Sequence, residues 1–529
     1  MESRARDELL TDARPKGLER ADFVFAAAIV AATTLFHLVY INHGVRNWID
    51  LGVAASDAAR IMDGDHWGRD FLAPYGPGRY YVTAIWFSLF GTSLFALNML
   101  YLCLMSAVAL LVWFAARRFL PRHLALGVVI LTAIAHGPVH KVWIGLFAVL
   151  FFLAAIRAFD RRTYGAGFVL GLTGALTGLF RNDLGVCAAI LGVLLIGLCA
   201  LRRADSDGTG RVGPLIAGLV MGGISVAAPI VILICACGDP AWIVESILAR
   251  IGVFDSVRVS DPGLGELFGA HNAEGYLQGS MVILLLAAPA AVALLGVVRL
   301  FVRSRCSRAG LLVVLGLLGI FLLNQWRLIP RFVRLMQAGP ILYVCVVLLF
   351  FEARRILSWA PRVARAVPLA ATVLLTGAMG WYLWEYTGEQ SQDSVAVLRF
   401  DEHYMDTPRA QCWAKTKRGS DMDLLVGVVK RFTEKGEAIF AGPGCPIVYF
   451  LSGRPNPTPF ADPYLYFLNP DAEARIITAL EERAVRVVVD QPRPIGGLSL
   501  ADAAPRLFNY IQTRFRQREQ VGRYVVLRR

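Results

Sequence analysis

The feature that most constrains this chain is the recurrence of apolar runs long enough to cross a lipid bilayer, which takes about 20 residues of helix. Such runs fill most of the sequence up to residue 384 of its 529 residues. Hydrophobic residues make up 56% of the chain and charged residues only 18%, whereas a soluble protein carries about 25% charged residues. The sequence therefore predicts a mainly α-helical, polytopic transmembrane bundle.

Pairs of arginines at the ends of these runs predict how the helices are oriented. Basic residues collect in the cytoplasmic loops of membrane proteins, so the pairs at 117–118, 161–162, 202–203 and 354–355 mark cytoplasmic ends. The net charge of +13 is thus a signal of topology and not of a nucleic-acid partner. Threading the chain from a cytoplasmic N-terminus gives 11 spans. They are 22–41, 93–116, 124–138, 142–159, 164–180, the run that ends at Arg202, 214–237, 279–301, 309–325, 338–352 and 367–384.

This threading predicts three regions: a cytoplasmic tail (1–21), a transmembrane domain (22–384) with a first external loop (42–92), and an external α/β domain (385–529). Helix and strand patterns alternate from MDLLVGVVKRF (422–432) onward, with a last helix predicted over APRLFNYIQTRFRQREQ, which favours a largely parallel sheet. This domain is expected to be an accessory domain, which either contacts a substrate through residues 454–458 or only shields the mouth of a site. Whether Cys412 and Cys445 form a disulfide is left open, because sequence does not show that they are close.

Charged residues stand at the predicted outer ends of two spans. LFRNDLG places Arg181 and Asp183 after the fifth span, and NQWRLIPRFVRLMQ places Arg327, Arg331 and Arg334 after the ninth. Ionisable groups at membrane depth are costly and usually mark function. Two alternatives stay open: the arginines extend to lipid phosphates, or Asp183 forms an ion pair that pins the span ends. His140 and His271 also lie in predicted outer loops and are interpreted as solvated.

The first external loop carries the other candidates. Asp50 precedes LGVAASDAARIM, whose small and apolar residues have the spacing of a short helix at the membrane surface. The pair Arg69-Asp70 follows that helix. In an ordinary solvated loop, aspartates cap helices and turns, which accounts for the aspartates between these positions better than for Asp50 or Asp70. Those intervening aspartates are Asp57, Asp63 and Asp65.

A pattern across this loop resembles that of the C-type membrane glycosyltransferases, which use polyprenyl-phosphate-linked sugars and are related to protein O-mannosyltransferases and lipid A aminoarabinose transferase. The pattern is Asp50-x-Gly, Ala58-Ala59, Gly64, Arg69-Asp70-Phe71, Gly76-Pro77, Tyr80-Tyr81 and Phe90-Gly91. FRNDLG and LSGRPNPTPF resemble elements of uncharacterised bacterial members. One departure is that Leu51 follows Asp50, where relatives often have a second carboxylate.

The resemblance implies an enzyme of the bacterial cytoplasmic membrane that transfers a sugar from a polyprenyl-phosphate donor to a hydroxyl of a lipid, glycan or protein acceptor, with inversion. Asp50 is the expected base, and Asp70 is the second choice or the partner of Arg69. Arg181 and Arg331 are expected to bind the donor phosphate, with Arg327 and Arg334 as alternates and Asp183 in support. No cofactor is expected and metal dependence is left open, since no phosphate-loop, HExxH or paired CxxC motif occurs. A lipid-linked glycan transporter or flippase and a non-catalytic membrane scaffold are the alternatives.

Overall fold

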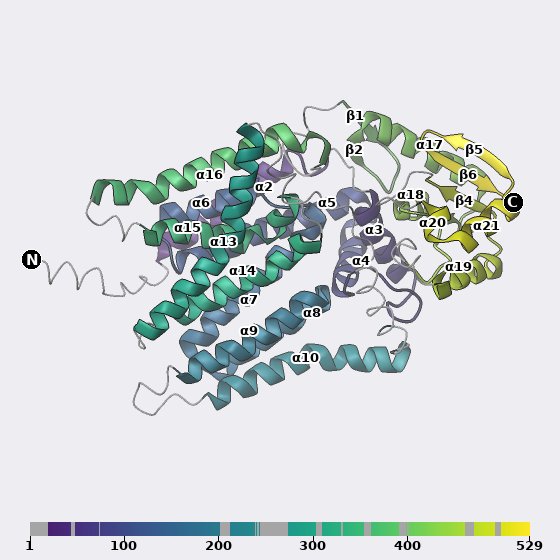
Figure 1. Cartoon of the computed structure of the whole chain (residues 1–529). Coiled ribbons are helices and arrows are strands. Elements are labelled where there is room, and N and C mark those ends of the chain that lie inside the picture. Colours follow the sequence, from purple (N-terminus) through teal and green to yellow (C-terminus); the bar gives the residue numbers. More distant parts are fainter. Residues whose placement is uncertain are drawn as a thin grey trace, which may run out of the picture. The chain divides into compact units, whose positions relative to one another are not determined.

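We describe a computed structural model of the chain (Figure 1). It describes residues 19–43, 48–73, 75–201, 212–238, 240, 243, 273–302, 309–328, 332–353, 361–390, 398, 401–460, 470–491 and 499–529. Everything below concerns these residues. The polar part of the predicted second external loop, 253–263, lies outside them.

Eleven apolar helices match the eleven predicted spans one for one. Within the described residues, 7 helices are long and apolar enough to cross a membrane, and four further apolar helices are shorter. The helices are α2 (Arg20–Leu38), α5 (Leu94–Arg117), α6 (Arg122–Ile134), α7 (Val142–Arg161), α8 (Tyr164–Phe180), α9 (Asn182–Leu201), α10 (Gly213–Cys237), α13 (Ala273–Val302), α14 (Ala309–Leu328), α15 (Phe332–Ala353) and α16 (Pro361–Gln390). The predicted polytopic helical fold is confirmed.

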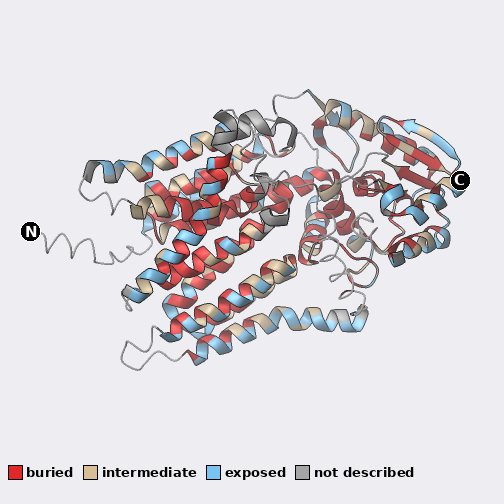
Figure 2. Ribbon diagram, viewed as in Figure 1, coloured by how far each residue is buried: buried red, intermediate tan, exposed pale blue. Residues whose placement is uncertain are grey.

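Large apolar side chains on these helices lie exposed on the outside of the bundle. Val193, Leu294 and Phe301 have 68%, 63% and 88% of their surface exposed, and pale blue segments mark such exposed positions along α10 and α13 in Figure 2. Hydrocarbon is the solvent that tolerates apolar surface of this kind, and lipid contact requires that the helix satisfy its own backbone hydrogen bonds. The chain is a multi-pass membrane protein.

Contacts group the chain into two compact units, each described separately here. The bundle unit comprises Met1–Val39, Leu102–Ala227 and Pro262–Ser394. The loop-and-tail unit comprises Tyr40–Tyr101, Ala228–Asp261 and Val395–Arg529. The predicted first external loop and the C-terminal tail thus fold in the same unit, although they are more than 290 residues apart in sequence. The domain border expected at residue 385 stays a sequence-based prediction.

In the bundle unit, α8 and α10 pack backbone against backbone through two glycine pairs. A Cβ atom added to Gly171 would lie 2.0 Å from the carbonyl oxygen of Leu219, and one added to Gly218 would lie 2.0 Å from that of Tyr164. Helices approach this closely only where small residues recur every fourth position. The four glycines are Gly167, Gly171, Gly218 and Gly222.

Ion pairs tie together the helix ends that carry the predicted cytoplasmic arginines. Asp22, which is fully buried, accepts from Arg117 and Arg122 at 3.0 Å each. Arg118 pairs with Asp160 at 2.6 Å. These arginines therefore join neighbouring helices as well as marking the ends of the spans.

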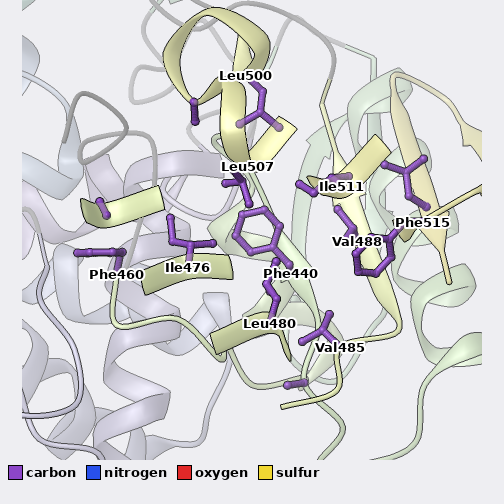
Figure 3. Packing of buried hydrophobic residues seen from close by; sticks show 14 of the residues in the cluster. Phe440, Phe460, Ile476, Leu480, Val485, Val488, Leu500, Leu507, Ile511 and Phe515 are labelled. Carbon is purple, nitrogen blue, oxygen red and sulfur yellow. The ribbon is translucent and has the colours of Figure 1, made fainter. Parts of the chain in front are cut away.

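In the loop-and-tail unit, the tail forms helices around a small sheet, as predicted. The elements are β1 (Glu402–Met405), β2 (Cys412–Lys415), α17 (Thr416–Phe432), β3 (Phe440–Ala441), α18 (Pro446–Ser452), α19 (Pro470–Glu482), β4 (Val487–Asp490), α20 (Leu500–Ala503), α21 (Pro505–Arg514), β5 (Gln517–Val521) and β6 (Tyr524–Arg528). Residues of α19, α21 and the sheet enclose an apolar core (Figure 3), which includes Phe440, Ile476, Val488 and Leu507. Leu72 of the first external loop also belongs to this core.

The prediction of a largely parallel sheet is wrong for the described strands. The four-stranded sheet has the order β3-β4-β6-β5, in which only β3 and β4 pair in parallel, and β1 and β2 form a separate antiparallel pair. The last predicted helix ends at Arg514, and QREQV forms the edge strand β5, which returns through Gly522 (φ +55°) into β6. A tight hairpin of this kind makes neighbouring strands antiparallel.

The two tail cysteines are free thiols. Cys412 and Cys445 are both buried and neither forms a disulfide. The pairing that the sequence left open is therefore not made, and both behave as small buried side chains.

Candidate active site

Asp50 lies in the first turn of α3 (Trp48–Met62), the helix predicted in the first external loop. The hydroxyl of Tyr75 donates a hydrogen bond to its Oδ1 atom at 2.9 Å. A hydrogen bond from a neutral donor to a carboxylate favours the ionised form and fixes the side chain in one orientation. The carboxylate is thus held in place by a tyrosine 25 residues away.

A buried arginine stands beside this pair. Arg79, in the first turn of α4 (Gly78–Phe90), is only 3% exposed, and its guanidinium carbon lies 4.6 Å from the ring centre of Tyr75 and 5.4 Å from that of Tyr80. Arginine is attracted to aromatic faces at such distances. One of its terminal nitrogens, Nη2, is buried and has no hydrogen-bond partner among the described residues.

Burial disfavours the charge of Arg79, but the surrounding groups outweigh it. Tyr101, Tyr80, Tyr75 and Asp50 together raise the pKa of Arg79 above its ordinary value. Of these four, Asp50 is the carboxylate, and the other three are phenols. Carboxylate, phenol and guanidinium therefore form one electrostatic cluster inside the loop-and-tail unit.

Close packing against the tail fixes the helix that carries Asp50. A Cβ atom on Gly52 would lie 2.3 Å from the backbone nitrogen of Ile447 in α18, so the two helices touch where Gly52 has no side chain. In the last turn of α3, Arg60 donates to the carbonyl oxygen of Thr458 at 2.9 Å. The orientation of Asp50 thus depends on residues about 400 positions later in the sequence.

The tail segment LSGRPNPTPF (451–460) contributes buried contacts to the packing of the first external loop. Thr458 is fully buried, and Leu72 donates through its backbone to Pro459 at 2.8 Å. Arg454 donates to the hydroxyl and the carbonyl oxygen of Thr433 at 2.8 and 2.7 Å. The bond from Leu72 holds the first external loop against the tail, and the bonds from Arg454 fix this stretch to the residue that follows α17.

Asp70 forms an ion pair with Arg69, which is one of the two roles predicted for Asp70. Their side chains meet at 2.6 Å, and the backbone nitrogen of His66 donates to Asp70 at 2.7 Å. Burial alone would raise the pKa of Asp70, but the bonds from Arg69 and His66 outweigh it and lower the pKa. Asp70 is therefore an engaged, ionised carboxylate.

In the bundle unit, Arg181 is the single non-helical residue between α8 and α9. It donates to Asp183 through Nε at 3.0 Å and through Nη2 at 2.9 Å, a two-pronged contact. A Cβ on Gly185 would lie 2.4 Å from the Cα of Gly178, so RNDLG is a tight turn between closely packed helices. The side chain of Arg181 retains 15% exposure and that of Asp183 38%, which leaves both within reach of a ligand.

The remaining sequence candidates fare differently. Arg327 and Arg334 lie in α14 and α15, but the positions of their side chains are outside the described structure, as is Arg331 altogether. His271 also lies outside it. The interpretation of His140 as a solvated loop residue is wrong: it is 4% exposed, because the short helix Val139–Lys141 turns inward between α6 and α7. Among the described residues, no three His, Cys, Asp or Glu side chains gather as metal ligands do.

Sequence reasoning missed Tyr75 and Arg79. The signal was the arginine in YGPGRYYV, which stands among aromatic residues where an interfacial segment has little use for a charge. An arginine there needs either water or a partner, and the structure supplies aromatic rings and a carboxylate.

The chain is similar to known proteins in structure, but no similarity in sequence was found. No protein-family model matches the chain, and no curated protein matches it in sequence. ArnT from Cupriavidus metallidurans bound to undecaprenyl phosphate superposes with a TM-score of 0.52 and 14% identity, over 96% of this chain and 97% of ArnT. Its apo state gives a TM-score of 0.50 and 13% identity over the same shares. The Archaeoglobus fulgidus oligosaccharyltransferase in the apo form gives a TM-score of 0.45 and 15% identity, over 88% of this chain and 69% of that one.

The likeness to ArnT covers nearly the whole length of both chains, with both the helical bundle and the tail included. At the level of the fold, it agrees with the resemblance that the loop motifs indicated. The chain has the fold of ArnT.

Proposed function

We propose that this protein is an integral-membrane glycosyltransferase that moves a sugar from a polyprenyl-phosphate donor to an acceptor hydroxyl at the outer face of the bacterial cytoplasmic membrane. Two observations support the proposal. The fold is that of ArnT, whose structure holds undecaprenyl phosphate. The stronger support is the position of the Asp50 carboxylate, which accepts a hydrogen bond from Tyr75 beside the buried Arg79.

In the proposed reaction, Asp50 takes the proton from the acceptor hydroxyl. The oxygen attacks the anomeric carbon, the bond between that carbon and the phosphate oxygen breaks, and polyprenyl phosphate leaves with the bonding electron pair. Tyr75 holds the base in position, and the Arg79 guanidinium lies in the same electrostatic cluster. A base of this kind contributes about 10²- to 10⁴-fold to rate.

The leaving phosphate needs cations, and arginine binds phosphate through two parallel hydrogen bonds. We assign this role to Arg181, oriented by Asp183, and to Arg331, with Arg327 and Arg334 as alternates. With Asp50 as the base and no carboxylate assigned as nucleophile, the proposed transfer proceeds with inversion, by the logic that separates the two classes of glycosidase.

The test is complementation of a strain that lacks the gene. Asp50→Asn removes the base and keeps the size of the side chain, and Asp63→Asn is the matched control, since Asp63 is an exposed carboxylate of the same loop. The surface glycans of each strain are analysed by mass spectrometry, and the amount of folded protein is checked in the membrane. A glycan lost on deletion should return with Asp63→Asn and stay absent with Asp50→Asn.

The same variants, together with a measurement of which leaflet holds the lipid-linked sugar, separate the alternatives. A scaffold protein would restore the glycan with either variant. A flippase would cause lipid-linked sugar to accumulate on the cytoplasmic leaflet when deleted, whereas the proposed enzyme leaves it on the outer leaflet. Full restoration by Asp50→Asn would overturn the proposed mechanism.

A further inference from the structure

One face of α4, in the loop-and-tail unit, carries an exposed apolar surface. Five residues recur there at the spacing of a single helix face, and we call them the α4 stripe: Val82, Ile85, Trp86, Leu89 and Phe90. Ile85, Leu89 and Phe90 have 61%, 70% and 60% of their surface exposed. These values equal those of the lipid-facing side chains of the bundle, although α4 is not among the candidate membrane spans.

The opposite face of α4 is packed into the protein. Four of its residues are at most 3% exposed, namely Arg79, Tyr80, Thr83 and Phe87. The ring centre of Phe87 lies 5.6 Å from that of Phe450 in the tail. α4 therefore has a distinct inner face, beside Asp50, and a distinct outer face.

The polar side chains on and beside the α4 stripe are satisfied within the protein. The indole nitrogen of Trp86 donates to the carbonyl oxygen of Ala96 at 2.7 Å, and the hydroxyl of Ser88 donates to that of Ala84 at 2.9 Å. The one charged residue of α4 is Arg79, on the inner face. A helix face in water usually carries charged side chains, whereas hydrocarbon requires that polar groups have partners. The outer face of α4 is thus suited to hydrocarbon.

α4 is also continuous with a surface that lies in the membrane. It ends three residues before α5, a candidate span, and its Trp86 is bonded to the first turn of that span. Gly91, at φ +93°, ends α4 in a conformation that glycine adopts without strain. With 13 residues α4 is about 20 Å long, which is too short to cross a hydrocarbon core about 30 Å thick.

We propose that α4 lies in the plane of the outer leaflet, with the α4 stripe in contact with lipid acyl chains. In the predicted topology, α5 begins on the outer side of the membrane. Amphipathic helices in this position bury their apolar face about 5–10 Å into the boundary between headgroups and acyl chains. A helix with its side chains is about 10–12 Å across, so Arg79 on the opposite face lies at the depth of the headgroups. The lipid contact itself is independent of the proposed reaction.

The test uses the full-length protein in nanodiscs of phosphatidylcholine, part of which carries a diazirine in the upper half of one acyl chain. After irradiation and digestion, mass spectrometry locates the lipid adducts. Parallel samples are oxidised by hydroxyl radicals, which label the side chains that water reaches. Adducts should form on the α4 stripe as they do on Phe301 of α13. Leu89 should be oxidised at least about tenfold less than Leu424, because water is scarce at the depth of acyl chains.

Leu424 is the matched control. It is an apolar side chain of α17, 61% exposed, on a helix of the tail that is not a candidate span. It should be oxidised and carry no adduct. Leu89→Glu should lower the adduct yield on Ile85 and Phe90 at least about threefold, because a carboxylate is costly among acyl chains. Leu424→Glu should leave that yield unchanged, and both variants should keep the parent thermal midpoint, since both positions are exposed.

Three results would contradict the proposal. Strong oxidation of the α4 stripe without adducts would show that it faces water. Protection from both reagents would show that protein covers it, and cross-linking of differently tagged copies would then distinguish a second copy from another segment of the same chain. Adducts that persist undiminished in folded Leu89→Glu would show a lipid contact that does not depend on the stripe. None of these measurements requires sugar transfer, so failure here is separate from failure of the mechanism proposed for Asp50.

Discussion

Removal of one hydroxyl, in Tyr75→Phe, tests whether the first external loop holds a catalytic base. The substitution keeps the ring against Arg79 and deletes the 2.9 Å hydrogen bond to Asp50. A hydrogen bond to a charged group contributes about 1.5–3 kcal/mol. If that bond holds Asp50 in its reactive orientation, kcat should fall about 10- to 100-fold, while the KM for the donor changes little.

The assay is a single-turnover measurement with membranes that hold the lipid-linked donor. Tyr404→Phe is the matched control, because Tyr404 belongs to the same unit and is 40% exposed. The decisive comparison is a double-mutant cycle: in the Asp50→Asn background, Tyr75→Phe should cost nothing further. Full activity of folded Tyr75→Phe, or an equal loss in both backgrounds, would refute the assignment of Tyr75 as the residue that positions the base.

Three further predictions concern stability and donor binding. Gly171→Ala places a methyl group into the α8–α10 contact and should destabilise the protein by about 1–3 kcal/mol, seen as a lower thermal midpoint, whereas Gly223→Ala has nothing within 4 Å and should not. Burial raises the pKa of Asp490 to about 6, against the opposing effects of its neighbours. Its native carboxyl therefore keeps a proton that the unfolded chain releases, and stability should fall as pH rises from about 4 to 6; Asp490→Asn should abolish this fall and stabilise the protein at pH 7 by at most about 3 kcal/mol. Asp183→Asn breaks a partly exposed ion pair and should change stability by less than about 1 kcal/mol, but it should raise the KM for the donor if Arg181 binds phosphate; an unchanged KM would argue against that role.

The membrane helices could be predicted from the sequence because each is recognised from its own run of apolar residues. A run of about 20 apolar residues needs no partner to be recognised, and each predicted span matches a helix. The tight turn at Arg181 follows from similar local information, since an Arg-x-Asp spacing brings the two charges together wherever the backbone bends.

The surroundings of Asp50 could not be predicted in this way. The donor to its carboxylate is 25 residues away, and the helix beneath it belongs to a tail some 400 residues later. The edge strand β5 was missed for a related reason. QREQV is as polar as a surface helix, and only its pairing with β6 decides the conformation. His140 was misjudged because burial depends on how the loop packs, which a loop's sequence does not reveal.

The contact between Gly52 and Ile447 has a practical consequence for anyone who cuts this gene. A shortened protein that stops after α16 would keep every predicted membrane crossing, yet it would leave one face of α3 bare and Arg60 without its distant carbonyl. Such a truncation would be expected to insert in the bilayer and still be inert. Supplying the missing C-terminal piece as a separate polypeptide, secreted to the same compartment, is then a rational way to attempt rescue.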